Sequence, residues 1–183
     1  MMITFRKFKL KIMHYFYYIF LIQLISLPAF AGLNIDKLSV PKGFEIEIFA
    51  NDLESPRQIT ETKDGFIVVG SKNGDKIFAI HDKNLDGFAE ERYLIASGLK
   101  NPTGVTYHQG DLYFAEIEKI WIVRNIDNWL LSSKDKSPKI ELFFDGLPSE
   151  TWHGFRHIRF GPDDNLYIPI GVPCNICIEP QTK

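Results

Sequence analysis

Hydrophobic and polar positions repeat along this chain with a period of 46 to 48 residues. Each copy combines a short loop that contains leucine, an apolar stretch, a turn with glycine or aspartate, and a second apolar stretch. The leucines that mark the three loops are Leu53, Leu99 and Leu147. A fixed period in this range, filled with short strands and turn residues, is typical of the blades of a β-propeller.

Further strand-like stretches lie between the three copies, at 44–49, 76–80 and 119–123. The first alternates cleanly, with apolar side chains at even positions and glutamates at odd ones, which predicts a half-buried strand. These stretches bring each repeat to about four strands, the usual number in one propeller blade. We therefore predict an all-β chain, a β-propeller with blades near 40–90, 91–140 and 141–183. The exception is 125–137, which predicts a short helical turn and a polar loop within the second blade.

The N-terminus has the layout of a signal peptide. Four cations at positions 6, 7, 9 and 11 precede an apolar run over 12–27, and Ala29 and Ala31 then form an A-x-A cleavage site. We predict a signal peptide over 1–31, a mature chain that begins at Gly32, and a periplasmic or secreted protein that meets the membrane only through its leader. The alternative is an uncleaved membrane anchor, since the run is nearly long enough to span a bilayer.

Residues 32–183 hold a little over three repeats, whereas closed propellers use about four to eight blades. We therefore expect 32–183 to be an incomplete β-propeller domain, from a truncated gene product or a fragment of a longer protein. The alternative is a small self-contained all-β domain. The formal net charge of −2, or about −6 without the leader cations, gives no basic footprint for nucleic acid.

Cys174 and Cys177 are the two cysteines of the chain and are spaced C-x-x-C. In an exported protein this spacing favours a local disulfide. Covalent haem attachment needs histidine directly after the second cysteine, where this chain has Ile178. Two cysteines alone do not close a tetrahedral zinc site.

Asp82, Asn84 and Asp86 stand at alternate positions before a glycine, as in the first half of a calcium-binding loop. The acid expected at the twelfth position is missing, because that residue is Tyr93, and Glu90 lies out of register with it. Asp, Asn and Gly also gather in hairpin turns for conformational reasons. A solvated turn is the favoured interpretation, and calcium is the alternative.

The densest polar cluster covers 151–163 and contains His153 and Arg156 just before an apolar stretch. In a propeller, a loop at this place reaches the face over the central channel. A histidine there can act as a general base, and Arg156 can hold an anionic cofactor or a developing oxyanion. The alternative makes His153 an ordinary loop residue that is hydrogen-bonded to the backbone.

The segment from His153 through the Gly161-Pro162-Asp163 turn to Cys177 resembles the pyrroloquinoline-quinone (PQQ) dependent sugar dehydrogenases. The resemblance is to the sorbosone dehydrogenase-like or pyranose dehydrogenase branch, related to soluble glucose dehydrogenases, and to the N-terminal half of such proteins. The earlier repeats fit the same family, so the likeness covers nearly all the mature chain. The stretch from 153 to 177 is its specific part.

The resemblance implies an exported six-bladed propeller that holds PQQ with calcium and oxidises a sugar hydroxyl or aldehyde, passing electrons to an acceptor. His153 matches the histidine that removes the proton. Arg156 and Arg57 are candidates for cofactor or substrate contact, and most cofactor and calcium ligands would lie in blades four to six. In the glucose dehydrogenases an Asp supports the base at the position of Val172, so glucose itself is not expected as the substrate.

The function that follows is an exported PQQ-dependent oxidoreductase acting on a sugar or aldose, inactive as this fragment. Two alternatives stay open: a non-catalytic propeller that serves as a binding module, and a truncated product without function.

Overall fold

The computed structural model describes residues 35–133, 135–172 and 175. The chain divides into two compact units, with the boundary between Ile46 and Glu47. In the described part of the first unit, the regular structure is one short 3-10 helix, η1 (Ile35–Lys37). The strand predicted over 44–49 is wrong: these residues pair with no strand, and Phe44 is 70% exposed. An alternating pattern needs a partner strand and a face to pack against, and this stretch has neither.

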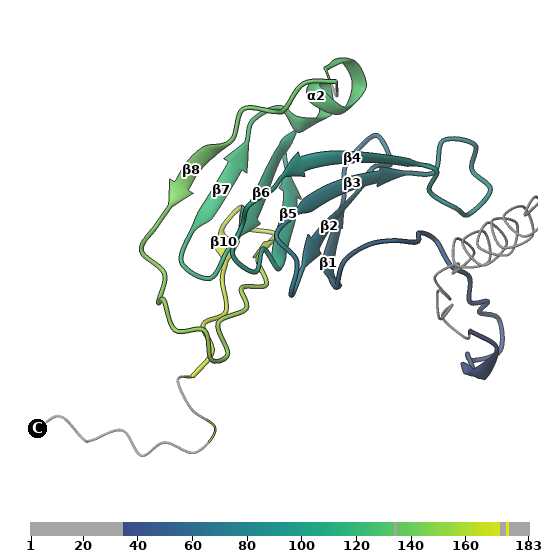
Figure 1. The fold of residues 1–183 in the computed structure, drawn as a ribbon, viewed down its shortest axis with the longest axis horizontal. Helices are drawn as coiled ribbons and strands as arrows, with labels where there is room; N and C mark the ends of the chain where they lie inside the picture. The colour runs from purple at the N-terminus through teal and green to yellow at the C-terminus, as the bar shows by residue number, and fades with distance from the viewer. Residues whose placement is uncertain (1–34, 134, 173–174, 176–183) are drawn as a thin grey trace, which may run out of the picture. The chain divides into compact units, whose positions relative to one another are not determined.

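The second unit contains two antiparallel meanders of four strands each (Figure 1). The first sheet consists of β1 (Pro56–Glu61), β2 (Ile67–Ser71), β3 (Ile77–His81) and β4 (Glu91–Ala96), in that order. The second consists of β5 (Gly104–His108), β6 (Asp111–Ala115), β7 (Ile120–Val123) and β8 (Glu141–Phe144), again in chain order. A third, two-stranded sheet pairs β9 (Arg159–Phe160) with β10 (Leu166–Tyr167).

Turn chemistry sets the register of the β5–β6 hairpin. His108 pairs with Asp111, so two residues form the turn. Gln109 and Gly110 both have positive φ, 49° and 89°. This is the backbone of a two-residue turn whose twist matches that of the strands it joins, and glycine takes its second position without steric cost.

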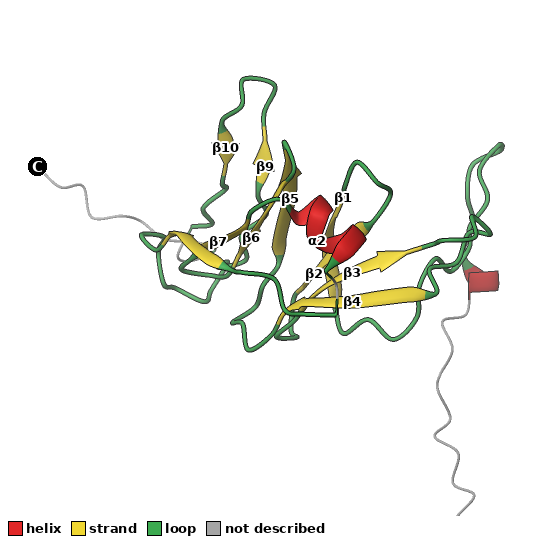
Figure 2. Ribbon diagram, turned by 90° about the horizontal axis from the view of Figure 1, so that it is seen from above, coloured by secondary structure: helices red, strands yellow, loops and turns green. Residues whose placement is uncertain are grey.

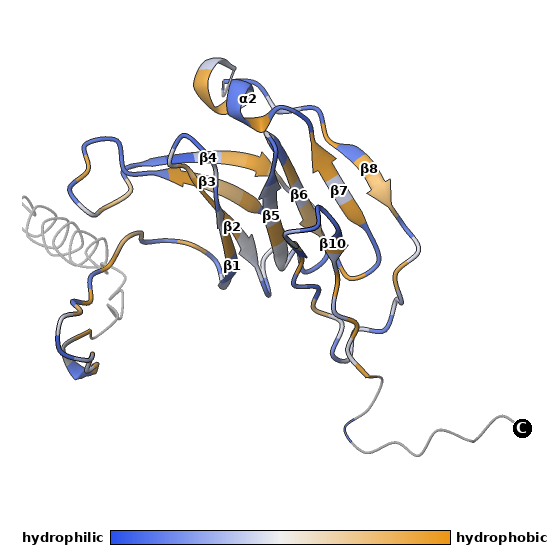
Figure 3. Ribbon diagram, turned by 180° about the vertical axis from the view of Figure 1, so that it is seen from behind, coloured by the Kyte–Doolittle hydropathy of each residue, from blue (hydrophilic) through white to orange (hydrophobic). Residues whose placement is uncertain are grey.

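The two four-stranded sheets pack against each other through apolar faces, which Figure 3 shows as orange stretches of the strands. The core includes Val68, Ile77 and Ala79 from the first sheet and Val105, Leu112 and Phe114 from the second. Helix α2 (Ile126–Ser132), inserted between β7 and β8, adds Ile126, Trp129 and Leu130 to this core. The predicted helical excursion within the second blade is therefore confirmed.

The opposite face of the second sheet packs against the third. Tyr113, Ala115, Ile120 and Ile122 meet Ile158, with Phe160 and Leu166 packed against them. Each sheet thus packs face to face against the next, and Figure 2 shows the three sheets one after another. The all-β fold class and the four-stranded repeat are confirmed.

The first strands of the three sheets converge. The side chain of Gln58 in β1 donates to the carbonyls of Val105 (2.9 Å) and Ile158 (2.7 Å) and accepts from the Ile158 N–H (3.3 Å). Residues of β1, β5 and β9 line a cavity of about 510 Å³ around this contact. The first strands of the three sheets therefore line one cavity, at the place where a propeller has its central channel.

The sheet boundaries differ from the predicted ones. The first sheet spans 56–96 and the second 104–144, against predicted blades near 40–90 and 91–140. The cause is the stretch 44–49: counting it as the first strand moved β4 out of the first blade and into the second.

Candidate active-site loop

The segment between β8 and β9, residues 145–158, carries His153. Its tip is a tight turn in which the Gly154 N–H donates to the carbonyl of Thr151 at 3.1 Å. His153 itself has a φ of 54°, in the left-handed region that non-glycine residues seldom adopt. A Cβ atom at Gly154 would clash with the carbonyl oxygen of Glu150, so glycine is required there. The local sequence thus imposes one backbone conformation on the histidine.

Arg156 anchors the same loop from beneath. Its side chain is 2% exposed, and it donates from Nε to the Ile117 carbonyl (3.0 Å) and from Nη2 to the Pro148 carbonyl (2.7 Å). Burial lowers the pKa of the Arg156 guanidinium, and the nearby charge of Glu150 opposes that shift. Arg156 therefore ties both ends of the loop to the β6–β7 connection.

His153 is exposed, and its ring stacks on Trp152 with centroids 5.2 Å apart. Among the described residues, none forms a hydrogen bond with its imidazole, so the alternative of a loop histidine fixed by backbone hydrogen bonds is not what the structure shows. A Cβ atom on Gly171 would lie 2.6 Å from the Cβ of His153. The segment that contains Val172 therefore passes directly beside His153.

A cavity of about 240 Å³ opens beside the loop. Its walls are formed by Pro148, Glu150, Trp152, Arg156, Ile170 and Gly171. Trp152 is 58% exposed, so a large aromatic surface faces solvent where the cavity meets the histidine. Exposed aromatic surface at a cavity is characteristic of ligand-binding sites.

A second cation lies near this loop. The Nζ of Lys72, directly after β2, is 5.1 Å from the centre of the Phe155 ring. Lys72 also donates its backbone N–H to the carbonyl of Ser55 at 2.9 Å. Arg57 is exposed at the start of β1, where Pro56 pairs with Ser71. Arg57 and Lys72 therefore lie at the same end of the first sheet. Sequence analysis missed Lys72, because no spacing relates it to Phe155.

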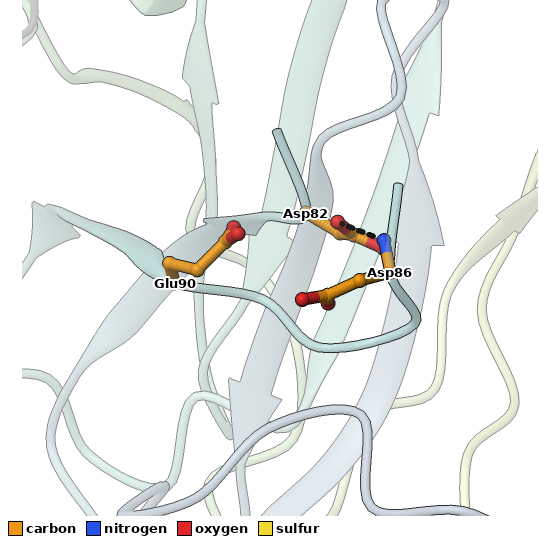
Figure 4. Close-up of side chains that lie close together, drawn as sticks. All are labelled: Asp82, Asp86 and Glu90. Carbon is orange, nitrogen blue, oxygen red and sulfur yellow. Dashed lines mark hydrogen bonds between the residues drawn. The ribbon is translucent and has the colours of Figure 1, made fainter. Parts of the chain in front are cut away.

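The β3–β4 connection brings Asp82, Asp86 and Glu90 together: each offers a carboxylate oxygen within 4.8 Å of the others (Figure 4). Glu90, at the ninth position of the loop, is out of register with the twelfth, as the sequence indicates, but its carboxylate lies close to the other two. Three carboxylates and the Asn84 side chain are the oxygen ligands that calcium prefers.

The same carboxylates also close the loop without a metal. Asp82 accepts from the backbone N–H groups of Asp86 (3.2 Å) and Gly87 (2.8 Å), and Asp86 accepts from that of Phe88 (2.9 Å). Asn84 donates to Asp86 at 3.0 Å. The loop extends from the outer end of the first sheet, away from the 145–158 segment in Figures 1 and 3. An ion here would serve the fold and would not touch His153.

Two of the predicted features lie outside the described residues: the signal peptide over 1–31 and the pair Cys174 and Cys177. Within the described ranges, no helix has the length and apolar character needed to cross a bilayer.

No known protein-family model matches the chain. An uncharacterised protein of Borreliella burgdorferi is 34% identical over 178 residues, which cover 92% of this chain and 45% of that protein. The chain thus spans less than half the length of this relative.

Several solved structures share the fold. The PQQ domain of pyranose dehydrogenase from Coprinopsis cinerea, in its holo form, aligns with a TM-score of 0.54 and 16% identity over 68% of this chain and 29% of that one. A calcium structure of a carbohydrate-active enzyme of family AA12 from Trichoderma reesei aligns with a TM-score of 0.54 and 13% identity, over 68% of this chain and 31% of that one. A putative glucose dehydrogenase from Thermus thermophilus aligns with a TM-score of 0.50 and 18% identity, over 68% of this chain and 40% of that one.

These likenesses define the class of the protein: an all-β chain with the fold of β-propeller sugar dehydrogenases. The likeness is one of fold, and two of these structures carry the names of sugar dehydrogenases, pyranose dehydrogenase and a glucose dehydrogenase.

Proposed function

We propose that this chain is part of an exported PQQ-dependent dehydrogenase that oxidises a sugar or aldose of the sorbosone or pyranose type and delivers the electrons to an acceptor. The observation that carries the proposal is the loop 148–156. A solvent-facing imidazole, His153, is held in a constrained turn by a buried arginine and stands beside a cavity with an exposed tryptophan.

His153 is proposed to take the proton of the sugar hydroxyl. An imidazole suits this role because it can take up a proton and release it again, and because, within the described residues, both ring nitrogens are free of hydrogen bonds. Val172 beside it offers no carboxylate to orient the ring. The stack on Trp152 and the backbone turn are therefore the groups that fix the position of the base.

The residues at this end of the molecule fit a planar anionic cofactor. PQQ, when bound, supplies the hydride acceptance of the reaction. Arg57 and Lys72 would pair with its carboxylates: both lie at the same end of the first sheet, and the Nζ of Lys72 lies over the Phe155 ring of the His153 loop. We propose that Arg156 positions the loop and does not contact the cofactor directly, because two of its N–H donors bind backbone carbonyls.

The test is dye-linked sugar oxidation, with PQQ and calcium supplied, by a full-length protein that contains this chain and by its His153→Ala variant. His157→Ala is a matched control, because His157 is an exposed histidine in the same segment. We expect His153→Ala to lose at least about a hundredfold in turnover, as is usual for a general base, and His157→Ala to keep it. Equal turnover in both variants would remove His153 from the chemistry.

The alternative function is a non-catalytic binding module, since a fold does not fix an activity. Its mark would be ligand binding with no PQQ-dependent oxidation in any variant. Export is a separate proposal, and mass spectrometry of the protein from the cell envelope tests it: cleavage after Ala31 gives a chain that begins at Gly32, and an intact Met1 terminus argues against it.

A further inference from the structure

The connection between β6 and β7, residues 116–119, holds the candidate active-site loop at two points. The carbonyl of Ile117 accepts from Nε of the buried Arg156 at 3.0 Å. The carbonyl of Glu118 accepts from the backbone N–H of Leu147 at 3.2 Å. Because Arg156 and Leu147 lie on either side of the tip of the loop, the conformation of this connection decides where the tip stands.

Glu116 begins the connection and binds two groups outside it. One carboxylate oxygen accepts from the backbone N–H of Lys100, in the segment that joins the two four-stranded sheets. The other accepts from the indole N–H of Trp121 at 2.7 Å. The backbone N–H of Glu116 donates to the carbonyl of Lys119 at 2.9 Å and closes the turn. The carboxylate thus fixes the connection by hydrogen bonds to an ionised acceptor, which are stronger than those between neutral groups.

The segment that Glu116 binds through Lys100 also reaches the loop by close packing. It leads into Gly104, the first residue of β5. A Cβ atom at Gly104 would clash with the backbone carbonyl oxygen of Arg156. Glu116 therefore joins two segments that both contact the loop, one through hydrogen bonds and the other through its backbone, so that a displacement of Glu116 is transmitted to the loop by two routes.

The second acid of the connection, Glu118, has a different environment. Its carboxylate pairs with Nζ of Lys100 at 3.3 Å, and the side chains of Lys100 and Glu118 are 57% and 39% exposed. An ion pair as exposed as this one contributes little to stability. The side chain of Glu118 is therefore the matched control for that of Glu116, since its replacement leaves the backbone carbonyl that binds Leu147 in place.

We propose that Glu116 is a positioning residue for His153: it fixes the β6–β7 connection and, through Arg156, the place of the imidazole. The inference rests on the proposed function, because the position of His153 matters for turnover only where its imidazole takes the proton. Within the part of the chain that the structure describes, Glu116 is not one of the residues that line the cavity beside the loop. Its effect on the reaction is therefore indirect.

The first experiment records the imidazole C–H signals of His153 by NMR in a full-length protein that contains this chain, with isotope-labelled histidine and at one pH. The rings of Trp152 and His153 stack with centroids 5.2 Å apart, so the indole ring current displaces these signals. His153→Ala identifies the signals, and Trp152→Ala gives their unstacked position. We expect Glu116→Ala to move them most of the way to that position and Glu118→Gln to leave them unchanged.

Glu116→Gln is the second variant and serves where Glu116→Ala does not fold. Its amide oxygen accepts from one of the two donors, Lys100 or Trp121, so we expect a smaller displacement of the His153 signals in the same direction. Spectra are recorded well below the thermal unfolding midpoint of each variant, where a lower global stability leaves the shifts of the folded state unchanged. Signals that stay in place in the folded Glu116 variants overturn the inference.

The second readout is the steady-state kinetics of sugar oxidation by the same full-length protein with PQQ and calcium. A misplaced general base lowers kcat and leaves substrate binding intact. We therefore expect Glu116→Ala to lose about tenfold in kcat with an unchanged KM for the sugar, and Glu118→Gln to keep both.

The two readouts separate the two proposals. A His153 signal that moves in Glu116→Ala, in a protein whose wild type oxidises no sugar, supports the positioning of the loop by Glu116 and rejects the proposed function alone. An active wild type whose kcat or His153 signal is unchanged in Glu116→Ala rejects the inference alone.

Discussion

Single residues decide how firmly the candidate active-site loop is held, and Arg156 is the main one. Two backbone carbonyls, from Ile117 and Pro148, depend on its guanidinium for their hydrogen bonds. Arg156→Met removes both donors and leaves the carbonyl of the buried Ile117 without a partner. We expect a loss of about 2 kcal/mol in the free energy of unfolding, measured by urea denaturation.

The control for Arg156→Met is Arg159→Met, because Arg159 is exposed in β9. It should change the free energy of unfolding by less than about 0.5 kcal/mol. Similar losses in both variants would mean that Arg156 does not anchor the loop.

The hydrogen bond from Tyr107 to Asp127 makes the stability of the fold depend on pH. Its hydroxyl donates to Asp127 Oδ2 at 2.7 Å, and burial, together with this hydrogen bond and the charge of Asp127, raises the pKa of Tyr107 above 10. Because the pKa of Tyr107 is higher in the folded state, the hydroxyl contributes its full stabilisation below the pKa of the unfolded chain, about 10. That stabilisation is lost as the pH rises through the pKa of the folded state.

The variant Tyr107→Phe isolates this effect. We expect it to be less stable than the wild type by about 2 kcal/mol at pH 8 and the difference to shrink above pH 10, as followed by urea unfolding at several pH values. Tyr113→Phe is the matched control, since Tyr113 is buried among the rings of Phe143 and Phe160. A difference that stays constant to pH 11.5 would contradict the assignment.

At the residue scale, sequence motifs located His153, and the structure places it in an exposed turn beside Val172. They did not reveal that Arg156 is buried, because the Ile117 carbonyl that it binds is distant in sequence. Nor did they reveal Lys72, which reaches Phe155 only after the sheets have packed. Side-chain roles that depend on long-range contacts cannot be derived from local spacing.

At the scale of elements, periodic apolar runs bounded by turn residues predicted most strands, including β2, β3, β6 and β7. The runs succeed there because each has a partner strand and a buried face. The stretch 44–49 shows the opposite case: the pattern is clear, but no neighbouring strand pairs with it. Alternation of apolar and polar residues therefore indicates that a segment can form a strand, but the strand forms only when a partner strand pairs with it.

The β3–β4 loop distinguishes a self-closed turn from a calcium site. Asp82 accepts two backbone N–H groups, so Asp82→Ala should lower the free energy of unfolding by about 1 kcal/mol even in EDTA, as thermal unfolding would show. Glu61→Ala, an exposed acid at the end of β1, is the control and should have little effect. If Asp82→Ala matters only when calcium is present, the loop is a calcium site instead.

At the scale of the whole second unit, successive sheets share faces, and the first strands meet around Gln58. The repeat of 46 to 48 residues predicted this arrangement, because a repeated meander buries its face only against its neighbours. Apolar side chains on β8 remain open to solvent: Leu142, Phe143 and Phe144 are 46% to 49% exposed.

The chain spans 45% of its Borreliella burgdorferi relative and 29% to 40% of the solved sugar dehydrogenases described above. The solved structures share the fold of most of this chain, and an activity is proposed on top of that fold. Arg57 and Lys72 lie at the same end of the first sheet, and Lys72 contacts Phe155 of the His153 loop, so these residues are the proposed connection between the fold and a cofactor.

The most direct measurement of that connection is the thermal unfolding midpoint of the chain as PQQ is added in the presence of calcium. A ligand that binds the native state must raise the midpoint. We expect a rise that saturates with PQQ and is smaller when Arg57 and Lys72 are both changed to glutamine. An unchanged midpoint at saturating PQQ would contradict it.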